Sequence, residues 1–300
     1  MELRHLRYFV AVAEERNFTR AAERLHIAQP PLSRQIQQLE EELGLRLLDR
    51  GERPLQLTEA GRFFYDQARN LLTQAQGIRA MTRRIALARR QLVIGYVGST
   101  LYRPLPEVIR RFRAIHADTQ LSLLEMTSLE QVEALKAGRI DVGFGRLLFD
   151  DPNVEREILA EEAMWLALPL EHSLAQRAEP LLLRDAAEET VLIYPRQPRP
   201  SYADQVLAAF RQRALEPAYL LEVRELQAAL GLVAAGMGVC VVPASVLRLR
   251  RDDVVYRPLA DEGLVSPLIM SVRREDRSEE LALIRRLLRE LLPREEAMAC

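Results

Sequence analysis

Two adjacent prolines, Pro30 and Pro31, interrupt a stretch of residues 3–43 that otherwise has the apolar spacing of amphipathic helices. Proline in a helix interior costs about 3 kcal/mol, whereas in the first turn its missing N–H bonds nothing anyway and its fixed φ suits the helix. The pair therefore predicts that a helix begins here. Residues 3–43 must form separate helices, with a short turn at residues 26–28 before the last one.

The apolar residues around the prolines recur at steps of three and four, as on one face of a helix. A break at Arg16 and Asn17 divides the first part, and Gly44 stands where a C-terminal cap is expected. The pattern predicts three short helices. Their apolar positions are Leu6, Phe9, Val10 and Ala13, then Phe18, Ala21, Ala22 and Leu25, then Leu32, Ile36, Leu39 and Leu43.

The first turn of the third predicted helix carries Gln29, Ser33 and Arg34 on its polar side. In a helix-turn-helix this turn enters the major groove of DNA, where Gln can pair with adenine and Arg with guanine. The segment LLDRGERPLQLT that follows predicts a β-wing, with Arg50 and Arg53 available for backbone phosphates.

The charge of the chain is uneven. Residues 1–90 contain 16 Arg against 11 acidic residues, a net charge of +5 that leaves −6 for the remainder. A basic end favours a phosphate partner, although a helical hairpin with a solvated polar face is the alternative interpretation. Three helices, a wing and the basic excess together favour DNA binding.

The first 65 residues resemble the winged helix-turn-helix of LysR-type transcriptional regulators at nearly every position, through LRYFVAVAEERNFTRAAERLHIAQPPLSRQIQQLEEELGLRLLDR and LTEAGRFFY. The resemblance implies a winged helix-turn-helix DNA-binding domain at residues 1–58, double-stranded promoter DNA and RNA polymerase as partners, and a C-terminal effector-binding domain. It also implies the DNA-binding residues, which are Gln29, Pro30, Pro31, Ser33 and Arg34 in the recognition helix and Arg53 in the wing.

A long helix is predicted at residues 59–90, because Thr58 is a good N-cap and no proline follows before residue 90. At 1.5 Å per residue it measures roughly 45 Å, too long for a small domain to cover, so a second chain is expected along its apolar stripe. Packing on the chain's own domain is the alternative; the resemblance implies a homodimer that assembles further into a homotetramer. The stripe follows a heptad through Phe64, Ala68, Leu71, Ala75, Ile78, Thr82 and Ile85.

The period changes from residue 91 onward. Short apolar runs, such as LVIGYVG, IDVGFG and VCVVP, alternate with helical segments at 103–115, 129–138, 202–214 and 225–235, which predicts an α/β domain at residues 91–300. Nucleotide-binding and HExxH motifs are missing, the four His are scattered, and the two Cys lack metal-ligand spacing. We therefore expect neither an enzyme nor a cofactor nor a metal site. The sequence lacks a signal peptide and a membrane span, so a cytoplasmic protein is expected.

Turns after the predicted strands carry hydroxyls, one Arg and helix starts, which are groups suited to a carboxylate. Ordinary helix caps, and an ion pair for the Arg, are the alternative interpretations. These turns are Gly98, Ser99 and Thr100 after the first strand, Thr127 and Ser128 after the second, Arg146 after the third, and Pro200, Ser201 and Tyr202 before a later helix.

Within the LysR family, IGYVGSTLY, QVEALKAGRIDVGFGR, YPRQPRPSYAD and ELQAALGLVAAGMGVCVVPAS are most similar to regulators of catechol and benzoate degradation that respond to cis,cis-muconate or a chlorinated muconate. The resemblance implies a two-lobed, periplasmic-binding-protein-like domain, with lobe I at 91–161 and 267–300 and lobe II at 162–266. The implied effector-binding residues are Gly98, Ser99, Thr100, Ser128, Arg146, Pro200, Ser201 and Tyr202.

One departure from this subgroup concerns charge. Some members have a second basic residue where this chain has Leu148, which weakens the assignment of a dianion unless Arg196 and Arg199 compensate. An activator of aromatic degradation genes that responds to muconate is the leading interpretation. A LysR-type regulator of another small acid, such as chloromuconate or benzoate, is the alternative within the family. A solute receptor without a regulatory role and an enzyme are the alternatives outside it.

Overall fold

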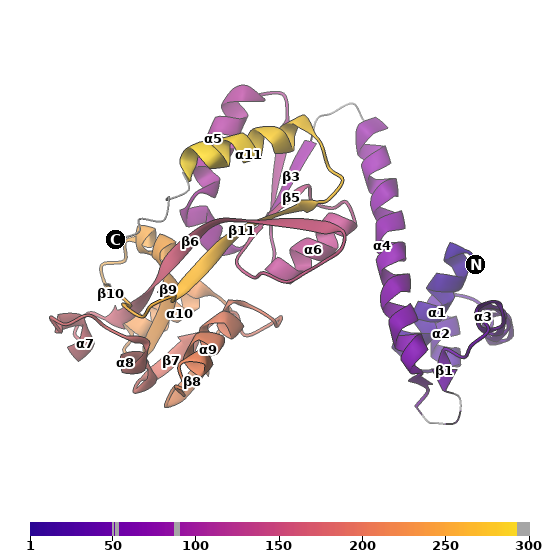
Figure 1. Ribbon diagram of the computed structural model, residues 1–300, viewed down its shortest axis with the longest axis horizontal. Coiled ribbons are helices and arrows are strands. Elements are labelled where there is room, and N and C mark those ends of the chain that lie inside the picture. The colour runs from indigo at the N-terminus through magenta and orange to yellow at the C-terminus, as the bar shows by residue number, and fades with distance from the viewer. Residues whose placement is uncertain (50, 52–53, 87–90, 293–300) are drawn as a thin grey trace. The chain divides into compact units, whose positions relative to one another are not determined.

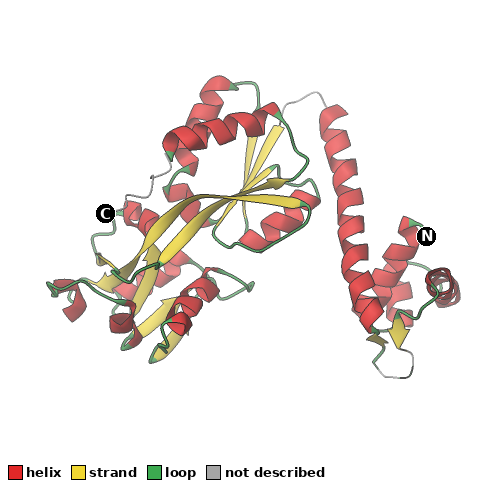
Figure 2. Cartoon of the chain, in the orientation of Figure 1, coloured by secondary structure: helices red, strands yellow, loops and turns green. Residues whose placement is uncertain are grey.

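The computed structural model describes residues 1–49, 51, 54–86 and 91–292. The chain folds into two compact units, the first containing Met1–Ala86 and the second containing most of the residues that follow (Figures 1 and 2). Within these described residues, no helix is both long enough and apolar enough to cross a membrane.

The first unit begins with the three predicted helices. The Asn17 side chain accepts hydrogen bonds from two backbone N–H groups at the start of the second helix, and Gly44, with φ of 69°, ends the third. Pro30 and Pro31 lie in the first turn of the third helix, as predicted. The helices are α1 (Leu3–Glu15), α2 (Phe18–Leu25) and α3 (Gln29–Leu43), and the side chains buried between them include Phe9, Val12, Ala21, Leu32, Ile36 and Leu39.

The predicted wing is confirmed as a two-stranded antiparallel sheet of β1 (Leu48–Asp49) and β2 (Gln56–Leu57). The Glu40 carboxylate of α3 accepts hydrogen bonds from the backbone N–H groups of Leu47 and Leu48, at 2.8 and 3.1 Å, and so fixes the start of the wing to α3. Arg50 and Arg53, the predicted phosphate ligands of the wing, lie outside the described residues.

Helix α4 (Glu59–Ala86) follows the wing, and Thr58 caps it by accepting a hydrogen bond from the N–H of Gly61 at 2.9 Å. A Cβ added to Gly61 would lie only 2.0 Å from the carbonyl oxygen of Leu47. Glycine is therefore required here, because the wing backbone crosses the helix in direct contact.

The predicted heptad stripe on α4 divides into two parts. Phe64 stacks edge-on against Phe9 at 5.1 Å and Ala68 is buried, so these two positions complete the core of their own unit. Further along, Leu71 and Ile78 are 45% and 62% exposed, and Phe63, outside the predicted stripe, is also exposed. The side chain of Ile85 lies outside the described part. The prediction of one continuous seam was wrong at its start, because the winged domain uses that turn itself.

The second unit is built on a nine-stranded mixed sheet with helices packed on it (Figure 1). The strand order is β4-β3-β5-β11-β6-β9-β7-β8, with β10 also paired to β6. The strands are β3 (Gln91–Tyr96), β4 (Gln120–Glu125), β5 (Val142–Gly145), β6 (Val154–Pro169), β7 (Thr190–Ile193), β8 (Tyr219–Glu222), β9 (Val239–Pro243), β10 (Val254–Pro258) and β11 (Val265–Arg273).

Strand β6 belongs to both halves of this sheet. Its residues 154–163 pair with β11, which also pairs with β5, whereas its residues 164–169 pair with β9 and β10. Two lobes result, and the lobe boundary implied by the resemblance, between residues 161 and 162, lies next to this change of partner.

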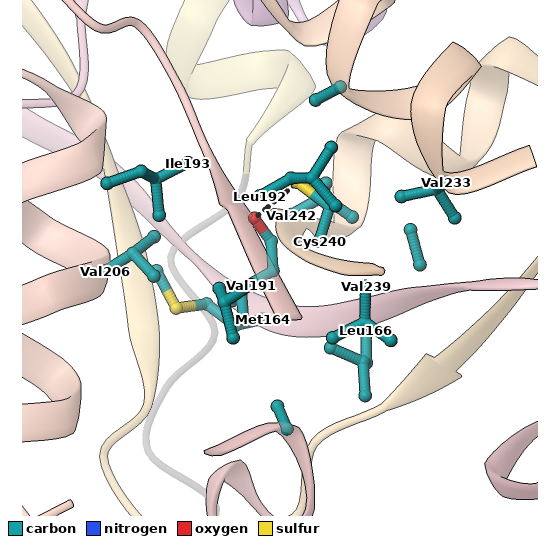
Figure 3. Close-up of a cluster of buried hydrophobic side chains, with 14 of the residues drawn as sticks. Met164, Leu166, Val191, Leu192, Ile193, Val206, Val233, Val239, Cys240 and Val242 are labelled. Atoms are coloured by element: carbon teal, nitrogen blue, oxygen red, sulfur yellow. Dashed lines mark hydrogen bonds between the residues drawn. The ribbon is translucent and has the colours of Figure 1, made fainter. Parts of the chain in front are cut away.

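Each lobe has its own apolar core. In lobe II, aliphatic side chains of β6, β7 and β9 interdigitate with those of helices α9 and α10, and the buried Cys240 fills a place among them as a small apolar residue (Figure 3). In lobe I, Phe112 and Phe144 lie with residues of β3 and of the last helix. The helices are η1 (Gly98–Tyr102), α5 (Leu105–Ile115), α6 (Ser128–Lys136), α7 (Ser173–Gln176), α8 (Leu183–Ala187), α9 (Tyr202–Gln212), α10 (Leu226–Ala234), η2 (Ala244–Leu249) and α11 (Glu279–Leu291).

Candidate functional site

The ends of parallel strands from both lobes meet around one cleft. Strands β3, β4 and β5 of lobe I and β7 and β9 of lobe II all direct their carboxyl ends toward it, which is where ligands bind in open α/β sheets. The cleft has a volume of about 280 Å³. Its wall mixes hydroxyls and charges with an apolar part formed by Val97, Tyr102, Met126, Leu147, Tyr194, Leu226 and Pro243.

Seven of the eight predicted effector-binding residues line this cleft. Thr100 is the exception: it is fully buried, and its hydroxyl donates to the carbonyl of Val97 at 2.8 Å, which closes the turn below Ser99. The residues that line the cleft are Gly98, Ser99, Ser128, Arg146, Pro200, Ser201 and Tyr202.

Arg146 follows β5 and is 3% exposed, so its guanidinium is almost fully removed from water. Its Nη2 lies 3.1 Å from a carboxylate oxygen of Glu162 on β6, and this carboxylate also accepts a hydrogen bond from the backbone N–H of Ser245 at 3.2 Å. Since Glu162 is itself only 12% exposed, the two opposite charges form a buried pair. The positive charge of Arg146 is therefore compensated within the protein.

Three serine hydroxyls complete the shell of the Arg146 guanidinium. Ser99 of lobe I accepts from Nε at 2.7 Å, Ser245 of lobe II accepts from Nη2 at 3.0 Å, and Ser266 at the start of β11 accepts from Nη1 at 3.3 Å. Ser266 donates onward to the side chain of Gln205 on α9, at 3.3 Å. One guanidinium thus links both lobes and the strand pair that joins them.

The other predicted hydroxyls also have partners inside the protein. The Ser128 hydroxyl accepts from the backbone N–H of Arg146 at 3.1 Å, while the neighbouring Thr127 and Glu130 cap α6. Ser201 caps α9 and donates to the carbonyl of Pro195 at 3.1 Å. The alternative interpretation, an ordinary helix cap, thus describes Ser201, whereas Ser128 holds the strand end that carries Arg146.

Two tyrosines form the wall of the cleft in lobe II. Tyr202 donates to the carbonyl of Val241 at 3.3 Å, and the hydroxyl of Tyr194 is buried without a partner among the described residues. Burial raises the pKa of both phenols, so they are neutral at ordinary pH and can only donate or accept hydrogen bonds. From lobe I, Tyr102 crosses to Gln227 of lobe II, whose amide donates to its hydroxyl at 3.3 Å.

Arg196 and Arg199, the two residues that could compensate for Leu148, have acidic partners elsewhere in this structure. Arg199 pairs with Asp204 at 2.8 Å and with Glu222 at 3.3 Å, and Arg196 pairs with Glu222 at 3.4 Å. Neither lines the cleft, because their pairs tie the loop before α9 to β8.

Sequence reasoning missed several residues of the site, namely Glu125, Glu162, Tyr194, Arg224, Ser245 and Ser266. Glu125 and Arg224 follow or end strands and could have been found by the rule that selected Ser128. Glu162 and Ser266 lie within paired strands, and no sequence pattern signals that they meet Arg146. No cluster of His, Cys, Asp and Glu suited to a metal occurs in the part of the chain that the structure describes.

The predicted DNA-reading residues lie at the start of α3. Gln29, Pro30, Pro31 and Arg34 are exposed and Ser33 is half-buried, while the intervening Leu32 is fully buried and holds the helix on the core. Neither Gln29 nor Arg34 has a polar partner among the described residues, so both are available to an external one. This exposed turn has the composition and position of a recognition helix.

Comparisons with known proteins agree with both units. The model of the bacterial regulatory helix-turn-helix protein, lysR family, matches residues 3–62, and that of the LysR substrate binding domain matches residues 86–293. The probable cat1 operon transcriptional activator of Acinetobacter lwoffii is 49% identical over 292 residues, 97% of this chain and 96% of that protein.

Two solved structures are also similar. Full-length CbnR complexed with its target DNA has a TM-score of 0.62 and 36% identity, covering 97% of this chain and 99% of that one. The effector binding domain of BenM, a regulator from Acinetobacter baylyi, with its effector benzoate has a TM-score of 0.64 and 38% identity, covering 67% of this chain and 91% of that one. The chain therefore belongs to the LysR family of bacterial helix-turn-helix regulators.

Proposed function

We propose that this regulator activates genes of aromatic-compound degradation, in the catechol and benzoate branch, in response to cis,cis-muconate or a related small dicarboxylate. The observation that carries this proposal is the interlobe cleft, where groups suited to a carboxylate surround a space of small-molecule size. The cat operon named for one relative and the benzoate bound by another support it. A different small acid, such as chloromuconate or benzoate, is the alternative effector.

The cleft suits a short unsaturated diacid because its lining combines groups suited to carboxylates with apolar side chains. Helices α6 and α9 both begin at the cleft, and their first N–H groups and positive dipole ends favour carboxylates. Tyr102, Tyr194 and Leu226 add apolar surface to the same lining, which suits a diene carbon chain. We assign one carboxylate to the side of Gly98, Ser99 and Ser128, and the other to the side of residues 200–202.

The proposed mechanism is a shift between two arrangements of the lobes. A ligand in contact with both lobes favours the arrangement in which it makes more contacts, and this preference is transmitted to the oligomer on DNA. Arg146 is placed to participate because its hydrogen bonds join Ser99 of lobe I to Ser245 of lobe II. The expected readout is a change in the extent of the DNA footprint and in DNA bending, with a consequent change in contact with RNA polymerase.

Promoter binding is assigned to the start of α3, with Gln29 and Arg34 reading bases, Pro30 and Pro31 setting the start of the helix, and Ser33 at its base. Arg53 remains the proposed phosphate ligand of the wing. We further propose a homodimer, and a tetramer built from it, through the exposed face of α4, where Leu71 and Ile78 would otherwise remain in water. A dimer requires two half-sites about one turn of DNA apart.

The test is calorimetric titration of the full chain with cis,cis-muconate, 2-chloromuconate, benzoate and succinate, followed by footprinting on a cat-type promoter with and without saturating ligand. We expect the tightest binding for a muconate and a changed footprint. Tighter binding of benzoate than of any muconate would favour the alternative effector. Footprints identical in extent and bending would contradict the mechanism, and turnover of muconate would instead indicate an enzyme.

The dimer proposal has its own test. Leu71→Glu with Ile78→Glu places charges on the exposed face of α4 without touching the core of the winged domain. We expect sedimentation velocity to show a smaller species. We also expect the variant to lose cooperative DNA binding. Gln76→Glu serves as a matched control, because it adds the same charge at an exposed position on another side of α4. An unchanged assembly in the double variant would contradict this interface.

A further inference from the structure

A dianionic ligand would need more positive charge than Arg146 provides in the cleft. Arg146 is already paired with Glu162, Arg196 and Arg199 are paired outside the cleft, and Leu148 is 57% exposed and uncharged. The carboxylates of Glu125, Glu130 and Glu225 also line the cleft. Without another cation, the second carboxylate of a ligand would meet a negative environment.

Arg224 is the cation that remains. It follows β8 and precedes α10, lines the cleft from lobe II, and is exposed. Among the residues that the structure describes, it makes no ion pair and no side-chain hydrogen bond. Its guanidinium therefore has all five N–H donors available, in a planar arrangement that suits a carboxylate.

Glu125, on lobe I, contributes the opposite charge. It ends β4 and lines the cleft, and a Cβ added to Gly98 would lie only 2.9 Å from its Oε1, so the carboxylate lies directly beside the Gly98 turn. Burial, and secondly the negative charge of Glu125, raise the pKa of the Tyr102 phenol in the same cleft. No counter-charge for Glu125 occurs among the described residues. A ligand carboxylate bound beside Gly98 and Ser99 would thus be repelled by Glu125.

We infer that Glu125 and Arg224 together set the charge selectivity of the cleft, so that it accepts dicarboxylates and rejects monocarboxylates of the same shape. Glu125 weakens binding of any single carboxylate on the lobe I side. A second carboxylate on the lobe II side, where residues 200–202 and Arg224 both line the cleft, recovers that loss by pairing with Arg224. This inference rests on the proposed function, because it assigns the two charges to the ligand named there.

The test compares cis,cis-muconate with its monomethyl ester, which keeps the carbon chain and removes one charge. Calorimetry uses the full chain as wild type, Arg224→Gln and Glu125→Gln, with Arg184→Gln as control, because Arg184 is an exposed Arg of the same lobe that does not line the cleft. We expect Arg224→Gln to weaken muconate binding about tenfold, since hydrogen bonds to charged groups contribute at least one factor of ten in binding. Its affinity for the monoester should stay within about twofold of the control, because that ligand has no second charge.

Two further readouts are expected. Glu125→Gln should strengthen binding of both ligands about threefold, as expected for removal of a partly solvated like charge. The weakening of muconate binding by added salt should be smaller in Arg224→Gln than in the control, because one exposed charge pair is gone.

Three outcomes would overturn the inference, and they are distinguishable. If wild type binds muconate and Arg224→Gln binds it as tightly as Arg184→Gln does, the ligand assignment stands and the role of Arg224 is wrong. If Arg224→Gln weakens binding of the monoester as much as binding of the diacid, Arg224 contributes to the shape of the cleft and does not distinguish ligands by charge. If wild type binds neither ligand, the proposed effector class is wrong, and the inference fails with it.

Discussion

The buried pair of Arg146 and Glu162 leads to a quantitative prediction for Glu162→Gln. The substitution keeps the size of the side chain and an oxygen acceptor but removes the charge that compensates the guanidinium. Removing one partner of a buried ion pair costs about 3–5 kcal/mol, because the other charge stays in a poor solvent. Three serine hydroxyls still accept hydrogen bonds from Arg146, so we expect the lower end of this range, about 3 kcal/mol in the free energy of unfolding.

Fluorescence provides a suitable assay, because Trp165 is the one tryptophan of the sequence and lies on β6 three residues after Glu162. Urea unfolding followed through this residue reports on the part of the sheet next to the pair. The double variant Arg146→Met with Glu162→Gln should be more stable than the sum of its single changes implies, since it leaves no uncompensated charge.

The same substitution should affect binding in the opposite direction. With Glu162 neutral, the positive charge of Arg146 is free to attract a ligand carboxylate, so we expect tighter muconate binding by a less stable protein. If Glu162→Gln changes the unfolding free energy by less than about 0.5 kcal/mol, with additive single and double changes, the pair does not have the buried character assigned to it.

Other predictions concern the frame around the sites. Gly61→Ala should destabilise the winged domain by about 2 kcal/mol or more and abolish DNA binding in a gel-shift assay, because its Cβ would overlap the Leu47 carbonyl. Arg257→Lys should lower the melting temperature, since its guanidinium donates to four carbonyls of residues 174–179 that one ammonium cannot all reach. Burial raises the pKa of Asp276, but hydrogen bonds from Ser278 and the charge of Arg273 outweigh it and lower the pKa below the ordinary 3.8. Because the pKa of Asp276 is lower in the folded state, its carboxylate stabilises the fold at pH values above the unfolded-state pKa. This contribution disappears as the pH falls through the folded-state pKa, so Asp276→Asn should flatten the decline of stability below about pH 4.

Much of the fold could be predicted because it depends on local patterns. Pro30 marked the start of α3, Gly44 its end and Thr58 the cap of α4, since each residue has a strong local preference. The alternation of strands and helices predicted the α/β unit, but the first ten residues of β6 and all of β8, β10 and β11 were missed. Residues 154–163 of β6 include five charged residues and lack a regular alternation, and β11 contains Pro267. Both strands are stabilised by pairing with each other, which a local pattern does not record.

The sequence predicted which residues meet at the candidate cleft better than it predicted the bonds among them. Turns after parallel strands must meet at one edge, so Ser99, Ser128 and Arg146 could be expected to lie together. The ion pair between Arg146 and Glu162 could not be predicted. The pairing of β6 with β11 brings the two residues close, and no local pattern records that pairing.

The shared strand β6 limits how the two lobes can move. The chain crosses between the lobes twice, once in β6 and once at the start of β11, and the two crossings are antiparallel neighbours in register at Glu162 and Ser266. Sliding one strand past the other would break the hydrogen bonds of this pair, whereas a bend across the pair preserves them. We therefore expect the lobes to move mainly by bending across these two strands. Glu162 and Ser266, which face each other in this pair of strands, both accept hydrogen bonds from Arg146. A change in the angle between the lobes would therefore move the partners that position the Arg146 guanidinium.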